Sequence, residues 1–200
     1  AEKRIAIIGA GVSGLVACKH ALEMGLRPVV FEARDGVGGV WSQTIASTRL
    51  QTPKPYYQFS DFPWPPTVAG NFPDHSRVLD YIRAYAAHHR LLPHINFHTR
   101  VVSLDYQTDD GGAKSPDLWG GSGEAFSPTG RWIVGVQDAR HPSSPILEHE
   151  MDFVIMGVGR YSDLPNVPEF ETGEGPEVFR GRVMHSMDYA AMGAEGAADF

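Results

Sequence analysis

Apolar residues at the start of the chain follow two different periods. Residues 5–8 are consecutive apolar residues and predict a buried strand. The next apolar residues recur at the spacing of one helix face: Leu15, Cys18 and Leu22. Gly25 is a typical helix stop, and a second apolar run covers residues 28–31. A strand, a helix and a second strand in this order predict a βαβ unit.

The pattern farther along predicts one more helix and four short strands. The helix is expected over residues 74–90, with Asp74 or Ser76 as its N-cap. Its apolar face consists of Val78, Leu79, Ile82, Tyr85 and Ala86. The strands are expected at 95–97, 100–106, 132–136 and 153–156. These elements together predict an α/β fold with a central parallel sheet and a small antiparallel sheet.

Two segments between these elements are irregular. Residues 111–130 are rich in Gly, Ser and Pro and are expected to form a long, mobile hairpin loop. Residues 51–73 contain six prolines interleaved with aromatic residues, which excludes regular secondary structure. We interpret this second segment either as an ordered loop over the sheet edge or a ligand, or as a packed crossover without a site.

A glycine-rich turn joins the first strand to the first helix. Gly9, Gly11 and Gly14 form the pattern GxGxxG. In this pattern the first glycine allows a tight turn, the second lets a pyrophosphate approach the main chain, and the third lets the helix pack close to the sheet. The phosphates then lie on free amide groups at the start of the helix, which include those of Val12 and Ser13. The chain is therefore predicted to bind a dinucleotide, and its α/β fold to be a Rossmann-like FAD/NAD(P)-binding fold.

The residues after the second strand indicate which dinucleotide. Glu32 ends that strand, where a carboxylate accepts hydrogen bonds from an adenosine ribose and disfavours the 2′-phosphate of NADP. The nearby Arg34 keeps NADP open as an alternative at this site. A second glycine turn follows at Gly38 and Gly39, directly before Val40 and Trp41. Such a turn suits the longer FAD molecule; the alternative is an ordinary glycine-rich turn beside a core tryptophan.

The composition narrows the class of protein. The formal net charge of −7 disfavours nucleic acid as a partner, because phosphate contacts need a basic face. The single cysteine, Cys18, is interpreted as a buried core residue. No apolar run approaches the length of a membrane span, and the first strand leaves no room for a signal peptide, so we expect a cytoplasmic protein. The histidines lack cysteine partners and an HExxH pattern, and no metal is assigned.

A motif near the other end of the chain is more specific than the glycine turn. Residues 179–189 match the pattern FxGxxxHxxxY, in which we interpret His185 as a structural residue that fixes a turn. Residues 59–63 read FSDFP. Along the chain, the glycine turn comes first, the FSDFP segment second and the FxGxxxHxxxY motif last. With these segments in this order, the chain resembles the flavin-containing monooxygenases of plant type. The resemblance extends from residue 5 to residue 189.

The resemblance implies an enzyme, a flavin-dependent monooxygenase with FAD and NADPH as cofactors. In this family NADPH reduces FAD, and O2 then forms a flavin hydroperoxide that passes one oxygen atom to a small nitrogen- or sulfur-containing substrate. A small-molecule substrate and O2 are therefore the expected partners. The resemblance assigns no oligomeric state.

The resemblance also implies site residues in the irregular 51–73 segment. Family members often have an Asn-Thr pair near the reactive edge of the flavin, whereas this chain has Gln51 and Thr52. Gln51 is the candidate catalytic residue, and Gln51, Thr52 and Val101 complete the candidate cofactor-binding set. Glutamine has the same amide donor and acceptor on a longer side chain, so it keeps the hydrogen bond only if its main chain lies farther back.

The domain organisation follows from the number of glycine turns of this type. We expect residues 1–200 to form one FAD-binding domain. The chain has no second strand-GxGxxG-helix unit, so we expect the NADPH-binding domain after residue 200, outside this sequence. The alternative is a non-catalytic or regulatory module that holds FAD or NAD. The second glycine turn and the FxGxxxHxxxY motif favour the monooxygenase.

Overall fold

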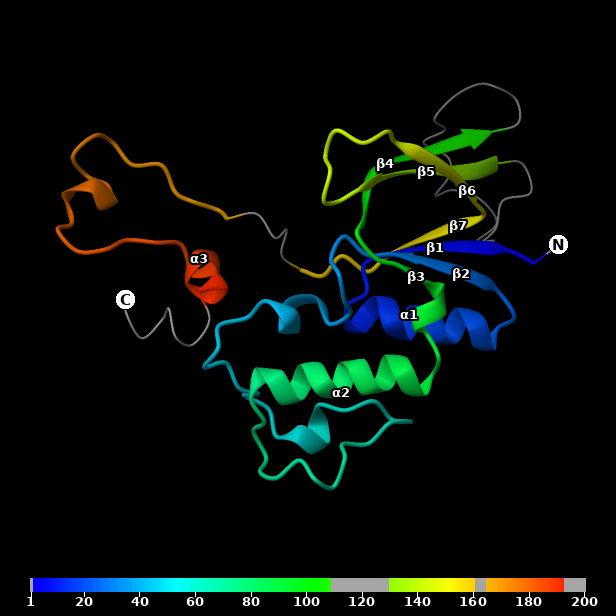
Figure 1. Cartoon of the computed structure of the whole chain (residues 1–200), viewed down its shortest axis with the longest axis horizontal. Coiled ribbons are helices and arrows are strands. Elements are labelled where there is room, and N and C mark those ends of the chain that lie inside the picture. The colour runs from blue at the N-terminus through cyan, green and yellow to red at the C-terminus, as the bar shows by residue number, and fades with distance from the viewer. Residues whose placement is uncertain (1, 109–129, 161–164, 193–200) are drawn as a thin grey trace, which may run out of the picture. The chain divides into compact units, whose positions relative to one another are not determined.

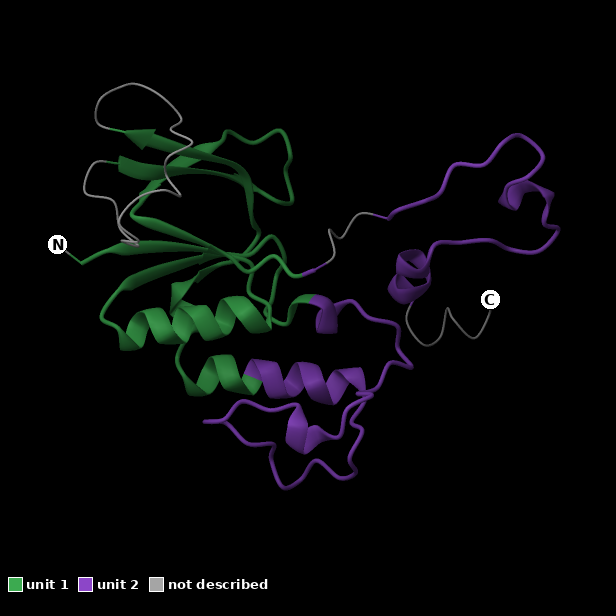
Figure 2. Ribbon diagram, turned by 180° about the vertical axis from the view of Figure 1, so that it is seen from behind, with its two compact units in different colours: residues 1–39, 84–159 green, residues 40–83, 160–200 purple. Residues whose placement is uncertain are grey.

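The chain folds into two compact units. The computed structural model describes residues 2–108, 130–160 and 165–192. Residues 1–39 and 84–159 form unit 1, and residues 40–83 and 160–200 form unit 2 (Figure 2). Of the loop expected over 111–130, only Gly130 is among the described residues.

Unit 1 is built around a four-stranded parallel sheet (Figure 1). The sheet order is β3-β2-β1-β7, with β1 at Arg4–Ile8, β2 at Arg27–Phe31, β3 at Ile95–Asn96 and β7 at Phe153–Met156. Helix α1, Val12–Glu23, connects β1 to β2. The predicted βαβ unit and the parallel sheet are confirmed, because Ala6 of β1 lies in register with Val29 on one side and Val154 on the other.

The two faces of this sheet are covered by different layers. An antiparallel sheet of order β4-β5-β6 lies over one face, and α1 lies over the other (Figure 1). Its strands are β4 at Thr99–Thr108, β5 at Gly130–Asp138 and β6 at Leu147–Met151. Because neighbouring residues of a strand point to opposite faces, Ala6 packs against the antiparallel sheet while Ile7 faces α1. The buried cluster between the sheets consists of Ala6, Phe31, Val134, Val136 and Met151.

Cys18 lies on the buried face of α1. Its side chain is fully buried, beside the equally buried Leu15. Burial in apolar surroundings raises the pKa of the Cys18 thiol to about 11. The interpretation of Cys18 as a core residue is confirmed, and its thiol is unreactive at neutral pH.

Unit 2 combines short helices with irregular segments. The first part of α2, His75–His88, belongs to this unit, as do the 3-10 turns Lys54–Tyr56 and Pro176–Val178 and the short helix α3, Ser186–Ala191. A further 3-10 turn at Gly39–Ser42 begins in unit 1, which also contains the 3-10 turn Leu92–His94.

Helix α2 is shorter than the sequence predicts, and both of its ends have a clear cause. The Asp74 carboxylate accepts hydrogen bonds from the Arg77 main chain (3.0 Å) and the Ser76 hydroxyl (2.7 Å), so Asp74 precedes the helix as its cap. At the other end, Arg90 has a positive φ of 54°, a conformation that ends a helix. Leu79 is half-buried, whereas the other predicted apolar positions of this helix are buried.

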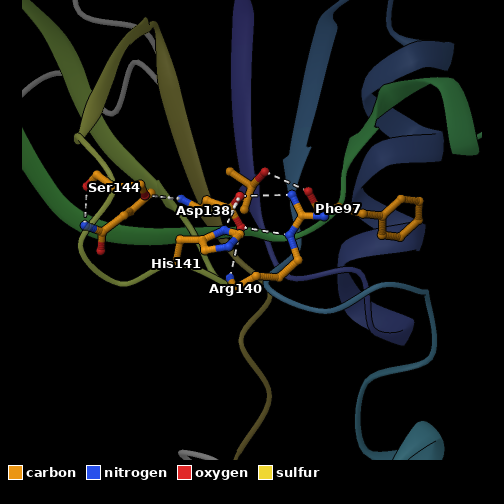
Figure 3. A network of polar contacts seen from close by, with 7 residues as sticks. Phe97, Asp138, Arg140, His141 and Ser144 are labelled. Atoms are coloured by element: carbon orange, nitrogen blue, oxygen red, sulfur yellow. Dashed lines mark hydrogen bonds and ion pairs between the residues drawn. The ribbon is translucent and has the colours of Figure 1, made fainter.

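Strand β6 was not predicted, because its sequence LEHEM is mostly polar and its first residues are exposed. It pairs with β5, where Trp132 lies opposite Met151. Side chains fix the connection between the two strands (Figure 3). Arg140 and His141 both bind the Asp138 carboxylate, and the hydrogen bonds from Arg140 hold the pKa of Asp138 far below its usual range. The Gln137 side chain donates to the carbonyl of Ser144 across the same turn (2.6 Å).

Candidate functional site

Two of the three glycines after β1 are required by the fold itself. Gly9 has a φ of +100°, and a Cβ atom there would lie 2.6 Å from the carbonyl oxygen of Gly157. A Cβ atom on Gly14 would lie 1.8 Å from the carbonyl oxygen of Gly9. Both distances are shorter than atoms can approach, and the atoms that they meet belong to the main chain. The turn therefore packs against β7 and α1 without room for either side chain.

Gly11 differs from its two neighbours. Its φ is −76°, a conformation that any residue adopts, and an added Cβ atom would lie 3.6 Å from its nearest neighbour, the Cα of Gly39. The fold therefore tolerates a methyl group at this position, and the glycine instead leaves the main chain bare at the start of α1. No side chain caps this helix end and its first turn holds no acidic residue, so the amides of the first turn are suited to an anion.

The second glycine turn lies against the first. The main-chain N–H of Gly38 donates to the carbonyl of Ala10 (3.1 Å). Gly38 and Gly39 both have positive φ values, 130° and 56°, and a Cβ on Gly39 would lie only 3.1 Å from the Cα of Gly11. We call residues 9–14 together with 38–39 the glycine cradle. The structure thus brings together two glycine turns that are separated by more than twenty residues in the sequence.

Glu32 lies at the carboxyl end of β2, next to the cradle. Its side chain is buried, and its two carboxylate oxygens accept hydrogen bonds from the main-chain N–H groups of Ala10 (2.7 Å) and Arg34 (2.9 Å). Two main-chain donors compensate for burial of the charge and fix its orientation. Each oxygen has a second lone pair, so the carboxylate is able to accept further hydrogen bonds from a ligand's hydroxyl groups.

Four predicted site residues belong to unit 2. Val40 is 68% exposed. The indole N–H of Trp41 donates to the Tyr57 hydroxyl (2.8 Å), and the two rings meet edge to face. Gln51 and Thr52 lie exposed in a bend. Val101, the remaining predicted residue, lies in β4 of unit 1, where it pairs with Val136 and packs against the buried cluster between the sheets.

The proline-rich segment is ordered by its own aromatic residues together with Tyr81 of α2, which the sequence pattern did not place beside them. Tyr81 of α2 stacks on Trp64 with ring centres 4.2 Å apart, and its ring also contacts Phe59 and Phe62. We call these four residues the aromatic cluster. The Tyr81 hydroxyl accepts a hydrogen bond from the Phe59 main chain (2.8 Å) and donates one to the Phe62 carbonyl. Burial raises the pKa of Tyr81, so its hydroxyl keeps its proton at neutral pH.

The cluster extends to Trp41 through a second tyrosine. The indole N–H of Trp64 donates to the main-chain carbonyl of Tyr57 (2.8 Å), whose hydroxyl is the partner of Trp41. Burial raises the pKa of the Tyr57 hydroxyl, partly offset by the hydrogen bond from Trp41. One signal for Tyr81 was present in the sequence, since it lies three residues after Val78 and therefore on the same helix face.

The histidine of the FxGxxxHxxxY motif has a structural role in unit 2. The His185 ring accepts a hydrogen bond from the main chain of Met187 (3.2 Å), and Asp188 accepts one from the main chain of His185 (3.3 Å). This reciprocal arrangement is a capping box at the start of α3. It agrees with the interpretation that His185 fixes a turn.

Two other features bear on the class of site. Within residues 2–108, 130–160 and 165–192, His, Cys, Asp and Glu side chains form no group of three that could hold a metal ion. Over the same residues, no helix combines the length and the apolar character that crossing a membrane requires.

Known proteins of similar sequence include flavin-containing monooxygenases of plants and animals. The chain is 42% identical over 199 residues to the probable flavin-containing monooxygenase 1 of Arabidopsis thaliana. This match covers 98% of the chain but only 37% of the relative, so the chain spans less than half of that protein's length.

Solved structures of other proteins share the fold of this chain. The S-allyl-L-cysteine S-oxygenase from Allium sativum matches with a TM-score of 0.68 and 24% identity, over 94% of this chain and 43% of that chain. An oxidized steroid monooxygenase bound to NADP matches with a TM-score of 0.62 and 24% identity, over 86% of this chain and 28% of that chain. The family model described as flavin-binding monooxygenase-like matches residues 2–195, nearly the whole chain, and the chain therefore belongs to that family.

Proposed function

We propose that this chain is the FAD-binding part of an FAD- and NADPH-dependent monooxygenase that transfers one oxygen atom of O2 to a small nitrogen- or sulfur-containing substrate. The single observation that carries the proposal is the bare main chain at Gly11, where the fold itself would accept a methyl group. A pyrophosphate needs such a surface at the start of a helix. Family membership supports a dinucleotide that carries a flavin.

The cradle and its neighbours divide the binding of FAD between them. We assign the pyrophosphate to the first-turn amides of α1, beside Gly11, Val12 and Ser13. The Glu32 carboxylate, already oriented by two main-chain donors, would accept the hydroxyl groups of the adenosine ribose. The second glycine turn, Gly38–Gly39, would let the remainder of the molecule pass close to the main chain.

Bound FAD and NADPH would supply the redox chemistry, and the protein's own residues would bind, orient and exclude water. We assign Gln51 and Thr52 to the reactive end of the flavin, with the Gln51 amide as a hydrogen-bonding group. Trp41 and the aromatic cluster hold the segment that carries these two residues. The Val101 side chain packs against the buried cluster between the sheets, so we assign the cofactor contact of this residue to its main chain.

NADPH is assigned to a second domain that the 200 residues do not include. The sequence has one GxGxxG turn of the dinucleotide type, and this turn is assigned to FAD. The steroid monooxygenase bound to NADP supports the use of this nucleotide by proteins of the same fold. Residues 1–200 are then the flavin-binding domain of a two-nucleotide enzyme.

The experiment compares flavin retention with folding in matched variants. The purified chain should show the flavin absorption band near ~450 nm, and heating should release FAD that chromatography identifies. Gly11→Val places an isopropyl group in the cradle and should weaken FAD binding by at least about tenfold. Ala87→Val adds a side chain of the same shape on an exposed position of α2 and serves as the control.

Circular dichroism and the thermal midpoint report whether each variant folds. The proposal requires that Gly11→Val unfolds like the wild type and loses FAD, while Ala87→Val keeps it. A colourless chain that does not take up added FAD would overturn the proposal, as would equal retention by Gly11→Val. Binding of NAD by that colourless chain would favour the non-catalytic module instead.

A further inference from the structure

A cavity borders the start of α2 in unit 2, and none of its lining residues is assigned to FAD. Its volume is about 280 Å³, close to the lower end of small-molecule sites, which begin near ~300 Å³. The loop of residues 67–74 forms one wall, and Arg49 and Arg77 contribute the cationic groups.

The loop that forms this wall is held at both of its ends. The Leu50 main chain donates to the Pro73 carbonyl (3.0 Å), and the His75 main chain donates to the Thr48 carbonyl (2.9 Å). At the other end, the Lys54 ammonium group donates to the Val68 carbonyl. Main-chain hydrogen bonds and the Lys54 contact therefore fix this wall of the cavity, and the exposed side chains of Arg49 and Arg77 lie beside it.

The charge of the lining is positive. Among the residues that the structure describes, neither Arg49 nor Arg77 forms an ion pair within 4.0 Å. The one acidic residue of the lining is Asp74, whose carboxylate accepts the Ser76 hydroxyl and the Arg77 main-chain N–H as the cap of α2. The charge of Arg49 also contributes to the lowered pKa of the Asp74 carboxylate. Two exposed guanidinium groups and one carboxylate give the lining a net charge of +1, which favours an anionic ligand.

Apolar groups complete the lining and restrict the chemistry of the ligand. Val68, Ala69 and Pro73 contribute aliphatic surface, and the Phe72 side chain is 48% exposed although it lines the cavity. A guanidinium group binds carboxylate and phosphate oxygens in pairs, and an aromatic face suits the apolar body of the same molecule. We propose that this cavity binds a small organic anion, through a carboxylate or a phosphate group held by Arg49 and Arg77.

The proposal is independent of flavin binding and is tested on the whole chain. Benzoate and phenyl phosphate serve as the two anionic probes, and benzyl alcohol is the neutral probe of similar shape. Titrations followed by the amide NMR signals of Gly70 and Arg77 report binding at the cavity. Both signals should shift with at least one anion, and the tighter of the two anions identifies a carboxylate or a phosphate ligand.

Variants connect the binding to the two guanidinium groups. The double variant Arg49→Gln/Arg77→Gln should weaken binding of the preferred anion by at least about tenfold. Arg83→Gln removes an exposed arginine of the same helix outside the cavity lining and should bind like the wild type. The dispersion of the remaining amide signals shows whether each variant is folded.

Three outcomes would overturn the proposal. Neither anion shifts the cavity signals, or benzyl alcohol binds as tightly as the anions, or the double variant binds no more weakly than Arg83→Gln. If the double variant loses its signal dispersion, the single variants Arg49→Gln and Arg77→Gln replace it, and each should weaken binding on its own.

Discussion

The glycine cradle and the aromatic cluster are held together by opposite means. In the cradle, Gly9 and Gly14 meet main-chain atoms, and the contacts depend on the absence of side chains. In the aromatic cluster, the chain has no regular structure around Phe59, and side chains of Tyr81 and Trp64 make the contacts. The glycine cradle therefore depends on residues without side chains, and the aromatic cluster depends on the rings and hydroxyl groups of its side chains.

This difference predicts how each region responds to substitution. A main-chain contact has no rotamer that could move away, so an added methyl group shifts the backbone or unfolds it. A side-chain cluster loses contacts one at a time, because its rings and hydroxyl groups are separate contributions. Three experiments examine this distinction, in order of expected effect.

The largest effect should come from Gly14→Ala. The new Cβ would lie 1.8 Å from the Gly9 carbonyl, so we expect the free energy of unfolding to fall by about 3 kcal/mol, measured by urea denaturation. Gly11→Ala is the matched control, since its Cβ meets nothing closer than 3.6 Å and should change stability by less than about 0.5 kcal/mol. Equal loss in both variants would show that the cradle glycines do not differ.

Tyr81→Phe should have the second-largest effect. The ring still stacks on Trp64, but the hydrogen bonds from the Phe59 main chain and to the Phe62 carbonyl are lost, which costs about 2 kcal/mol in unfolding free energy. Tyr56→Phe removes a hydroxyl from a side chain that is 82% exposed and should leave stability unchanged. A loss of the same size in both variants would mean that the Tyr81 hydroxyl has no special part in ordering the segment.

The smallest effect is expected for Asp74→Ala, whose cost in unfolding free energy should depend on pH. Hydrogen bonds from Ser76 and the Arg77 main chain lower the pKa of Asp74 in the folded state. Its capping contribution is therefore complete above the unfolded pKa near 4 and is lost as the pH falls through the lower folded value. Asp74→Ala should cost about 1 kcal/mol at pH 6, and the difference from the wild type should shrink at pH 3.

Asp80→Ala is the control for the acid experiment, since Asp80 lies exposed on the same helix. Denaturation at both pH values gives the two differences directly. If the cost of Asp74→Ala is the same at pH 3 as at pH 6, Asp74 does not cap α2 through its charged form. Asp74 caps the helix that carries Tyr81 of the aromatic cluster, whereas no side chain caps α1 at the glycine cradle.

The sequence predicted the features that depend on neighbouring residues. The strand, turn and helix around Gly9, Gly11 and Gly14 follow from local spacing, and Glu32 follows from its place at a strand end. Strand β6 could not be predicted in this way, because its polar residues adopt a strand only through pairing with β5. The aromatic cluster depends on contacts across some twenty positions of the chain, as between Phe59 and Tyr81, and no local pattern encodes these.

The hydrogen bond between Gly38 and Ala10 joins the two glycine turns and so restricts the length of each. An insertion in either loop would draw that amide away from its carbonyl and part the facing α-carbons of Gly11 and Gly39. Homologous sequences should therefore vary in size in the outer bends and keep a constant residue count in both of these turns. Insertions intended to change the specificity of this protein should therefore be placed outside the two glycine turns.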